Sequence, residues 1–168
     1  MTGCDLHLTA EISRQLRLAL QSFCTDAGAL GSAVLDQCGT QIAYGHPAAL
    51  VASPAATIGN TPEIAALAAG AFAATRELAS RLGDHAFNGL VHHGHERHFY
   101  LCPVSNDYLL LTVFATGTPA GVVRHCASQT APKIGALLDA ASTPPPGWNS
   151  RLLNASPPTS AQVVNTAV

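Results

Sequence analysis

The sequence predicts an α/β (α+β) domain in which helices cover both faces of a sheet. Residues 60–124 contain, one after another, an alanine-rich helical pattern, three strand patterns and the start of another helix. The last of the three strands, 108–115, is almost wholly apolar, and such a strand is covered on both of its faces. A further helix and a hairpin precede residue 60, so three helices are available to cover the sheet.

The first helix is predicted to begin at Thr9, a suitable N-cap, and to end near Gly28. Apolar residues recur in it at intervals of three and four: Ile12, Leu16, Ala19, Leu20 and Phe23. Two short β-prone runs follow, 30–35 and 40–44, around a turn at 36–39. The aspartate of that turn can bond its own backbone and its glycine can take a positive φ, so these runs are predicted to form a hairpin.

The second helix is predicted between Asn60, as its N-cap, and Gly83, as its stop, with Pro62 and Glu63 in its first turn. It has an apolar stripe of Ile64, Leu67, Ala68, Ala71, Thr75, Leu78 and Leu82. Beside the stripe lies a surface of small residues, Ala66, Ala69, Gly70, Ala73 and Ala74. Glycine inside a helix costs about 1 kcal/mol relative to alanine. Gly70 therefore indicates that another helix packs closely at this position. The alternative is that the sequence is merely rich in alanine and glycine and has no such role.

Two further strands, 86–93 and 97–102, form a second predicted hairpin, and 108–115 follows after a polar turn. The last helix begins at Thr118 and Pro119. Pro132 interrupts it and is predicted either to kink the helix near residue 128 or to divide it into two short segments, since proline removes a donor and clashes with the preceding turn.

The chain divides by composition into three parts. Residues 9–141 form the predicted domain, 1–8 are an N-terminal extension, and 142–168 are rich in Pro, Ser, Thr and Asn without sustained periodicity. We interpret this last part as a disordered tail. The connection 45–59 contains prolines and small residues and is predicted to lie on the surface.

Composition excludes several classes of function. Charged residues make up only 11% of the chain and the net charge is −2, which argues against nucleic-acid binding. No apolar stretch is long enough for a membrane span, so no membrane partner is expected. The five cysteines contain no CxxC pair and no secretory signal precedes them, which indicates a cytoplasmic location.

Four histidines, His92, His93, His95 and His98, lie close together on the second hairpin. The segment 95–98 is one residue short of the HExxH zinc motif, and residues three apart on a strand point to opposite faces. His98 and Cys102 share a face but lie about 13 Å apart along a strand. A metal would need ligands from elsewhere, so we expect no metal site and interpret the hairpin as polar and solvated. The chain also lacks GxxxxGK[ST], so no nucleotide cofactor is expected.

Four segments carry a resemblance to a known family. They are AVLDQCGTQIAYG (33–45), AALAAGAFAATRELASRLG (65–83), residues 87–94, and YLLLTVFATGTPAGVVR (108–124). In their order and spacing they resemble the roadblock family, also called the dynein light chain family. They look closest to its bacterial MglB-type members, which regulate Ras-like small GTPases. The resemblance covers about residues 9–141.

The resemblance implies a profilin-like, three-layer α-β-α fold. A five-stranded antiparallel sheet would have the second helix on one face and the first and last helices on the other. Members of the family commonly form homodimers by packing their second helices together and joining their sheets through the third strand. Carried over to this chain, the dimer interface would contain Ala66, Gly70, Ala73, Phe87, Val91 and His93.

The resemblance also implies a non-catalytic regulator that binds a Ras-like small GTPase and modulates GTP hydrolysis or nucleotide exchange. Candidate contacts are the exposed positions of the second helix: Arg76, Glu77, Ser80 and Arg81. Arg76 or Arg81 could act as an arginine finger, but both are also favourable as solvated residues near a helix C-terminus. The alternatives are a scaffold subunit that contacts no GTPase, and a metal- or ligand-sensing domain that uses the histidine hairpin and the connection 45–59.

Overall fold

The computed structural model describes residues 9–50 and 60–142 of the chain. Its helices are α1 (Ala10–Ala27), the short 3-10 helix η1 (Ala48–Leu50), α2 (Pro62–Arg81) and α3 (Ala120–Ser142). Its strands are β1 (Ala29–Asp36), β2 (Gln41–Gly45), β3 (Leu90–His93), β4 (Arg97–Pro103) and β5 (Tyr108–Ala115). The predicted N-terminal extension, part of the connection 45–59 and the predicted tail from residue 143 lie outside the described residues.

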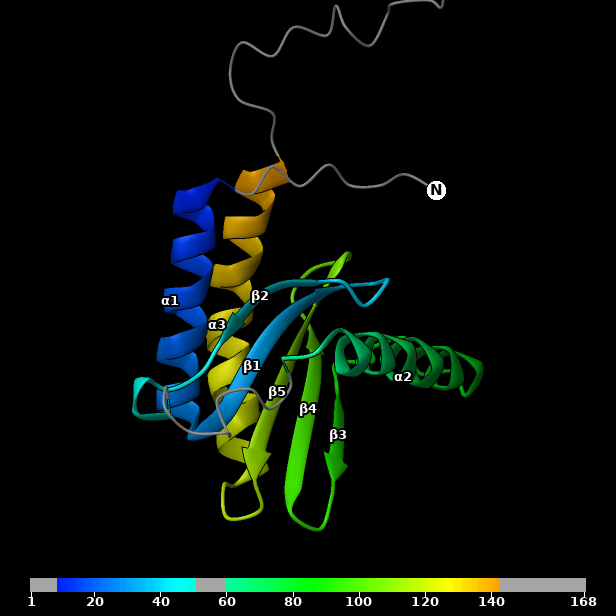
Figure 1. The fold of residues 1–168 in the computed structure, drawn as a ribbon. Helices are drawn as coiled ribbons and strands as arrows, with labels where there is room; N and C mark the ends of the chain where they lie inside the picture. The colour runs from blue at the N-terminus through cyan, green and yellow to red at the C-terminus, as the bar shows by residue number, and fades with distance from the viewer. Residues whose placement is uncertain (1–8, 51–59, 143–168) are drawn as a thin grey trace, which may run out of the picture.

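The five strands form one antiparallel sheet in the order β2-β1-β5-β4-β3. α1 and α3 lie side by side on one face and α2 lies on the other (Figure 1). The three-layer prediction is therefore confirmed. β5 lies at the centre of the sheet, where Leu110 and Phe114 pack towards α1 and α3 while Leu109 and Leu111 pack towards α2. This position explains why the strand is apolar on both faces.

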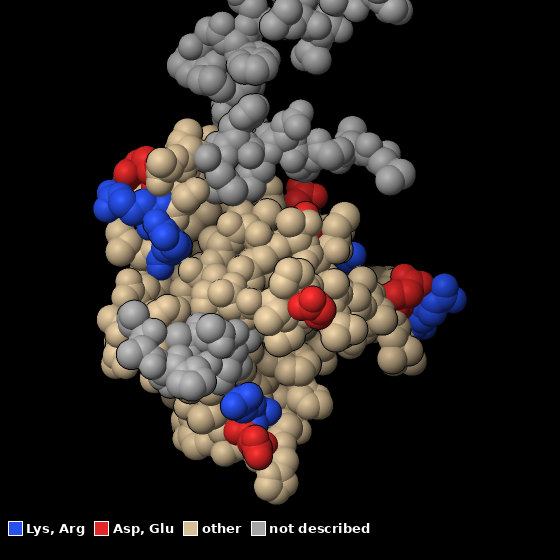
Figure 2. Space-filling model, in the orientation of Figure 1, with Lys and Arg blue, Asp and Glu red and all other residues tan. Residues whose placement is uncertain are grey.

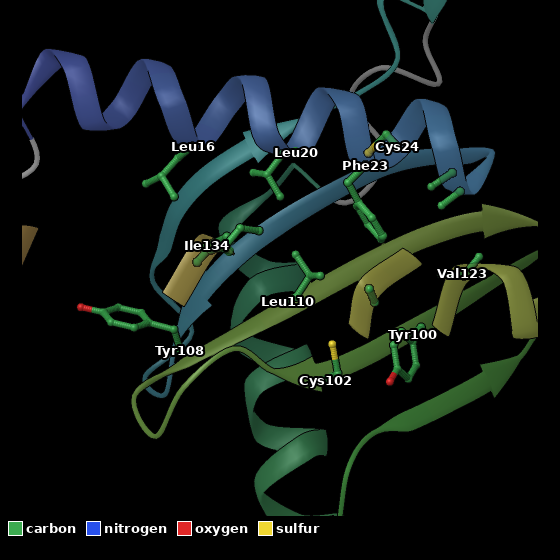
Figure 3. Packing of buried hydrophobic residues seen from close by; sticks show 14 of the residues in the cluster. Leu16, Leu20, Phe23, Cys24, Tyr100, Cys102, Tyr108, Leu110, Val123 and Ile134 are labelled. Carbon is green, nitrogen blue, oxygen red and sulfur yellow. The ribbon is translucent and has the colours of Figure 1, made fainter. Parts of the chain in front are cut away.

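The core on the α1 and α3 face consists of large side chains (Figure 3). Its fully buried members include Leu16, Leu20 and Phe23 from α1 and Val123, Ile134 and Leu138 from α3. Thr9 caps α1 as predicted, with its Oγ1 accepting a hydrogen bond from the Ile12 amide at 3.3 Å. Gly28 ends the helix in the left-handed conformation.

On the other face, α2 contacts the sheet mainly through small side chains. The buried residues of α2 are Ala65, Ala68, Ala69 and Phe72. Ala68 belongs to the predicted stripe and Ala69 to the predicted small-residue surface, while Ala65 and Phe72 belong to neither, so neither group is the core face. The large residues of the stripe point away from the sheet: 74% of Leu67 and 58% of Leu78 are exposed.

The start of α2 differs from the prediction by one residue. Thr61, not Asn60, is the N-cap, because its Oγ1 accepts from the Ile64 amide at 3.3 Å. The Oδ1 atom of Asn60 instead accepts a hydrogen bond from Nε2 of Gln41 in β2, at 2.6 Å. A contact between distant parts of the chain thus determines which of two suitable caps is used.

β3 is shorter than the predicted strand 86–93, since it begins at Leu90. Phe87 lies in the connection before the strand, where its ring packs against Phe72 of α2 with 5.2 Å between ring centroids. The connection then passes close to β4, because a Cβ on Gly89 would lie 2.8 Å from the Tyr100 ring. Because of these contacts, residues 84–89 do not form part of the strand.

α3 continues through Pro132 as one helix, so the predicted division into two segments does not occur. Ala131 and Ile134, on either side of the proline, are both buried, and this packing supports the helix where the backbone donor is missing. Among the described residues, no helix has the length and apolarity that crossing a lipid bilayer requires.

Gly39 holds the β1–β2 turn against α2. Its φ is +83°, and a Cβ at this position would lie 2.4 Å from the Cα of Ala66. We predict that Gly39→Ala lowers the free energy of unfolding by about 2 to 4 kcal/mol, from the strained φ and the clash together. Urea unfolding followed by circular dichroism measures this loss.

Gly83→Ala is the matched control, because Gly83 has a φ of +85° and no atom within 4 Å of an added Cβ. It carries the backbone strain without the clash, so its loss is expected to be about 1 kcal/mol. Equal losses in the two variants would show that the turn does not press against α2.

Candidate protein-binding surface

The outer side of α2 is apolar and exposed. At about 3.6 residues per turn, Gly70 and Ala74 lie on the side of the helix opposite Ala65 and Phe72. We call this region the α2 surface and define it by its exposed members: Ile64, Ala66, Leu67, Gly70, Ala71, Ala73, Ala74 and Leu78. Of the six large hydrophobic residues that are exposed in the described part of the chain, four belong to α2 and its C-cap. Exposed apolar residues that are concentrated in one region commonly mark a site of contact with another molecule.

The described part of the chain contains no contact that requires glycine at position 70. A Cβ added there would meet nothing within 4 Å, so no neighbouring element requires a glycine. Glycine in a helix interior is less favourable than alanine by about 1 kcal/mol. The small residues predicted for the interface, Ala66, Gly70 and Ala73, are all exposed and are free to contact another molecule.

β3 is an edge strand of the sheet. Within the described residues it pairs only with β4, so its outer edge presents unpaired backbone groups. Val91 and His93 lie on this strand, whereas Phe87 lies in the connection before it. The predicted interface residues therefore occupy the outer side of α2, the edge strand and the connection between them.

Charged groups are few on the visible face of the molecule, and an acidic and a basic side chain meet near the end of α2 (Figure 2). Three of the four candidate GTPase contacts come together in this part of the molecule. They line a hollow of about 300 Å³ formed by Ala73, Arg76, Glu77, Ser80, Asp84, His85 and Phe87. The guanidinium of Arg76 lies 6.0 Å from the centroid of the Phe72 ring, within the range of a cation–π contact.

Arg81, the fourth candidate contact, does not line the hollow. Its Nε lies 2.8 Å from Oε1 of Glu77, and the two side chains are 76% and 62% exposed. An ion pair that exposed contributes at most about 1 kcal/mol to stability. Both side chains can therefore leave the pair at little cost and contact a partner.

The structure brings His93 and His98 together, places His92 on the other face of the sheet and leaves His95 in the turn between β3 and β4. The ring of His92 stacks on Phe99 on the α2 side of the sheet, with 4.8 Å between centroids. His93 and His98 are cross-strand partners on the other side, with 4.7 Å between their rings. The Nδ1 atom of His98 is buried and lacks a hydrogen-bond partner. In the described part of the chain, no three His, Cys, Asp or Glu side chains are grouped so that they could hold a metal ion.

The sequence interpretation missed two features of this surface. It gave no role to Asp84 and His85, which line the hollow because the chain turns back after Gly83. It also did not identify the sheet-facing side of α2. The spacing i, i+3, i+4, i+7 of Ala65, Ala68, Ala69 and Phe72 was the available signal for that side.

Three solved structures share the fold of this chain. An MglB with tetrameric arrangement has 24% identity and a TM-score of 0.69, over 83% of this chain and 99% of that chain. The gliding protein MglB of Thermus thermophilus has 25% identity and a TM-score of 0.67, over 83% of this chain and 99% of that chain. Myxococcus xanthus MglB has 21% identity and a TM-score of 0.62, over 75% and 96%.

These structures confirm the resemblance to MglB-type members. No curated protein matches the sequence. A family model described as the Roadblock/LC7 domain matches residues 16–115, from the middle of α1 to the end of β5. The matched region is more than half of the chain, and the chain therefore belongs to the Roadblock/LC7 domain family.

Proposed function

We propose that this protein is a homodimeric, non-catalytic regulator that binds a Ras-like small GTPase in the cytoplasm and modulates its GTP hydrolysis or nucleotide exchange. The observation that carries the proposal is the exposed apolar α2 surface, for which the described part of the folded chain provides no cover. The likeness to MglB structures supports it.

The proposed dimer packs the α2 helices of two copies against each other. Ala66, Gly70 and Ala73 allow the two backbones to approach closely, while Leu67 and Leu78 bury their side chains beside the crossing point. A twofold arrangement uses the same patch on both copies. In this dimer the β3 edges, with Val91 and His93, pair across the axis, and Phe87 lies beside them.

The proposed GTPase contact lies beside the paired helices, at the hollow that Arg76, Glu77 and Ser80 line. Arg81 lies next to it through its ion pair with Glu77. Because Arg76 is held over the Phe72 ring, it suits a surface contact better than insertion into the site of another protein. We therefore favour regulation by remodelling of the GTPase over donation of an arginine finger.

We predict that Gly70→Leu abolishes the dimer. The added side chain separates the two helices by more than their small neighbours can compensate. The monomer fold is expected to stay intact, because leucine is the better helix former by roughly 0.8 kcal/mol and nothing lies within 4 Å of the site. Light scattering should show the mass falling from twice 17.2 kDa to 17.2 kDa.

Gly117→Leu is the control for this test, since Gly117 is also exposed, has open space around it and lies far from α2 in the sequence. Its mass should equal that of the unaltered protein. If Gly70→Leu keeps the dimeric mass, this side of α2 is not the interface.

We predict that the protein binds a Ras-like GTPase encoded near its own gene, and that Arg76→Ala and Arg81→Ala each weaken the binding about tenfold. Loss of a charged contact at an interface commonly costs about 1.4 kcal/mol, which corresponds to that factor. Titration calorimetry with the GTPase loaded with GDP and with a non-hydrolysable GTP analogue measures the two affinities.

Arg14→Ala is a matched control, because Arg14 also forms an exposed ion pair, with Glu11 at 2.8 Å, but on α1, which covers the opposite face of the sheet. It should leave GTPase binding unchanged. A dimeric protein that binds the GTPase in neither nucleotide state would reject the regulatory role and favour a scaffold subunit.

A further inference from the structure

A second hollow lies on the face of the sheet opposite α2, between α3, β4 and the connection before β3. Its volume is about 480 Å³, within the usual range of small-molecule sites. We call it the α3 groove and define it by its lining residues: Asn88, Tyr100, Cys102, Gly121, Arg124, His125, Ala127, Ser128 and Ala131. Figure 3 shows Tyr100 and Cys102 on β4, on the side of the sheet that α1 and α3 cover.

The groove exists because α3 presents small residues to β4. Gly121, Ala127 and Ala131 line it, whereas the larger Val123, Ile134 and Leu138 of the same helix are fully buried in the core. Because these side chains are small, they do not cover Tyr100 and Cys102, which form the floor of the groove. The α3 side of the groove therefore combines these small residues with the polar side chains of Arg124, His125 and Ser128.

The Tyr100 side chain is held in a fixed position. Gly89 lies behind it, where an added Cβ would be 2.8 Å from its ring and 2.9 Å from its hydroxyl oxygen. Burial raises the pKa of Tyr100 to about 12, and the nearby Arg124 guanidinium opposes that rise. The hydroxyl therefore stays protonated at neutral pH, and it interacts with the side chains of Cys102 and Arg124.

The polar groups of the groove suit an anion. Arg124 is the one residue with a full formal charge among those that line it, and its guanidinium has five N–H donors. The amide of Asn88 and the hydroxyl of Tyr100 add two neutral donor groups. The hydroxyl of Ser128 already donates to the carbonyl oxygen of His125 at 2.7 Å, which leaves it as an acceptor.

One carboxylate lies nearby. Asp84 lines a smaller hollow that continues from the groove and shares Asn88, Tyr100 and Arg124 with it. Its Oδ1 accepts a hydrogen bond from the Ala86 amide at 3.0 Å, so it is engaged with its own connection. This hydrogen bond leaves the negative charge of Asp84 in place, but Asp84 does not line the groove itself, where Arg124 is the charged side chain.

We propose that the α3 groove binds a small molecule with an oxyanion head, a carboxylate or a phosphate, and a compact apolar body. The head would contact Arg124, Asn88 and Tyr100, and the body would lie against Ala127 and Ala131. The site lies on the opposite face from α2 and does not depend on a GTPase partner. Asn88 belongs to the connection 84–89, which also lines the hollow beside α2, so both sites contact one segment.

The test uses the full chain labelled with ¹⁵N and four probes at constant pH and ionic strength: acetate, benzoate, inorganic phosphate and phenyl phosphate. We expect one head group to shift the backbone amide signals of Asn88, Tyr100, Arg124 and Ser128. The probe with the ring should bind at least about threefold more tightly than its parent ion, because the ring buries apolar area. The head group that binds more tightly identifies the class of ligand.

Arg124→Gln should weaken binding at least about tenfold, because it removes charge-assisted hydrogen bonds. Arg124 is exposed, so the variant is expected to fold. Lys133→Gln is the matched control, an exposed cation on the same helix that does not line the groove, and it should leave the affinity unchanged.

Three results would overturn the proposal. The first is the absence of shifts with all four probes at about 50 mM, far above the Kd expected of a weak site. The second is equal affinity in Arg124→Gln and Lys133→Gln, which would indicate an adventitious ion only. The third is that the probe with a ring binds no more tightly than its parent ion in either pair. That result would show that the groove does not bind an apolar body.

Discussion

The close contact between α2 and the sheet determines the surface on which the proposed function rests. α2 touches the sheet through three alanines and one phenylalanine, so its backbone lies near the strands and near the turn at Gly39. A helix seated in this way has no room for leucines on its inner side. Its large apolar residues are therefore placed on the outside, where a second molecule is needed to remove them from water.

Small residues have a different effect on the two faces of the sheet. On the α2 face they let the helix approach, and the large side chains lie on the outer surface of the protein. On the other face, α3 is held at a distance by the large core that it shares with α1, so its small residues leave the α3 groove instead. The proposed protein-binding surface and the proposed ligand site therefore lie on opposite faces of the sheet. The connection 84–89 contacts both.

The elements that depend on local signals could be predicted from the sequence. Thr9 and Gly28 bound α1 as predicted, and the apolar run at 108–115 indicated β5 and the cover on both of its faces. Features set by distant contacts could not be predicted. Asn60 accepts a hydrogen bond from Gln41 and Thr61 caps α2 instead. Phe87 packs on Phe72 rather than lying in β3. The candidate contacts on α2 were found because they lie close in sequence, whereas Tyr100 and Arg124 meet only in the fold.

The proposed dimer covers the α2 surface with a second copy of the chain. Sedimentation equilibrium of the unaltered protein over a wide range of concentrations tests it most directly. We expect a single mass of twice 17.2 kDa at micromolar concentrations, because the exposed leucines and the edge strand are then both covered. A mass of 17.2 kDa at all concentrations up to about 100 μM, where any interface of standard size would be occupied, would contradict it.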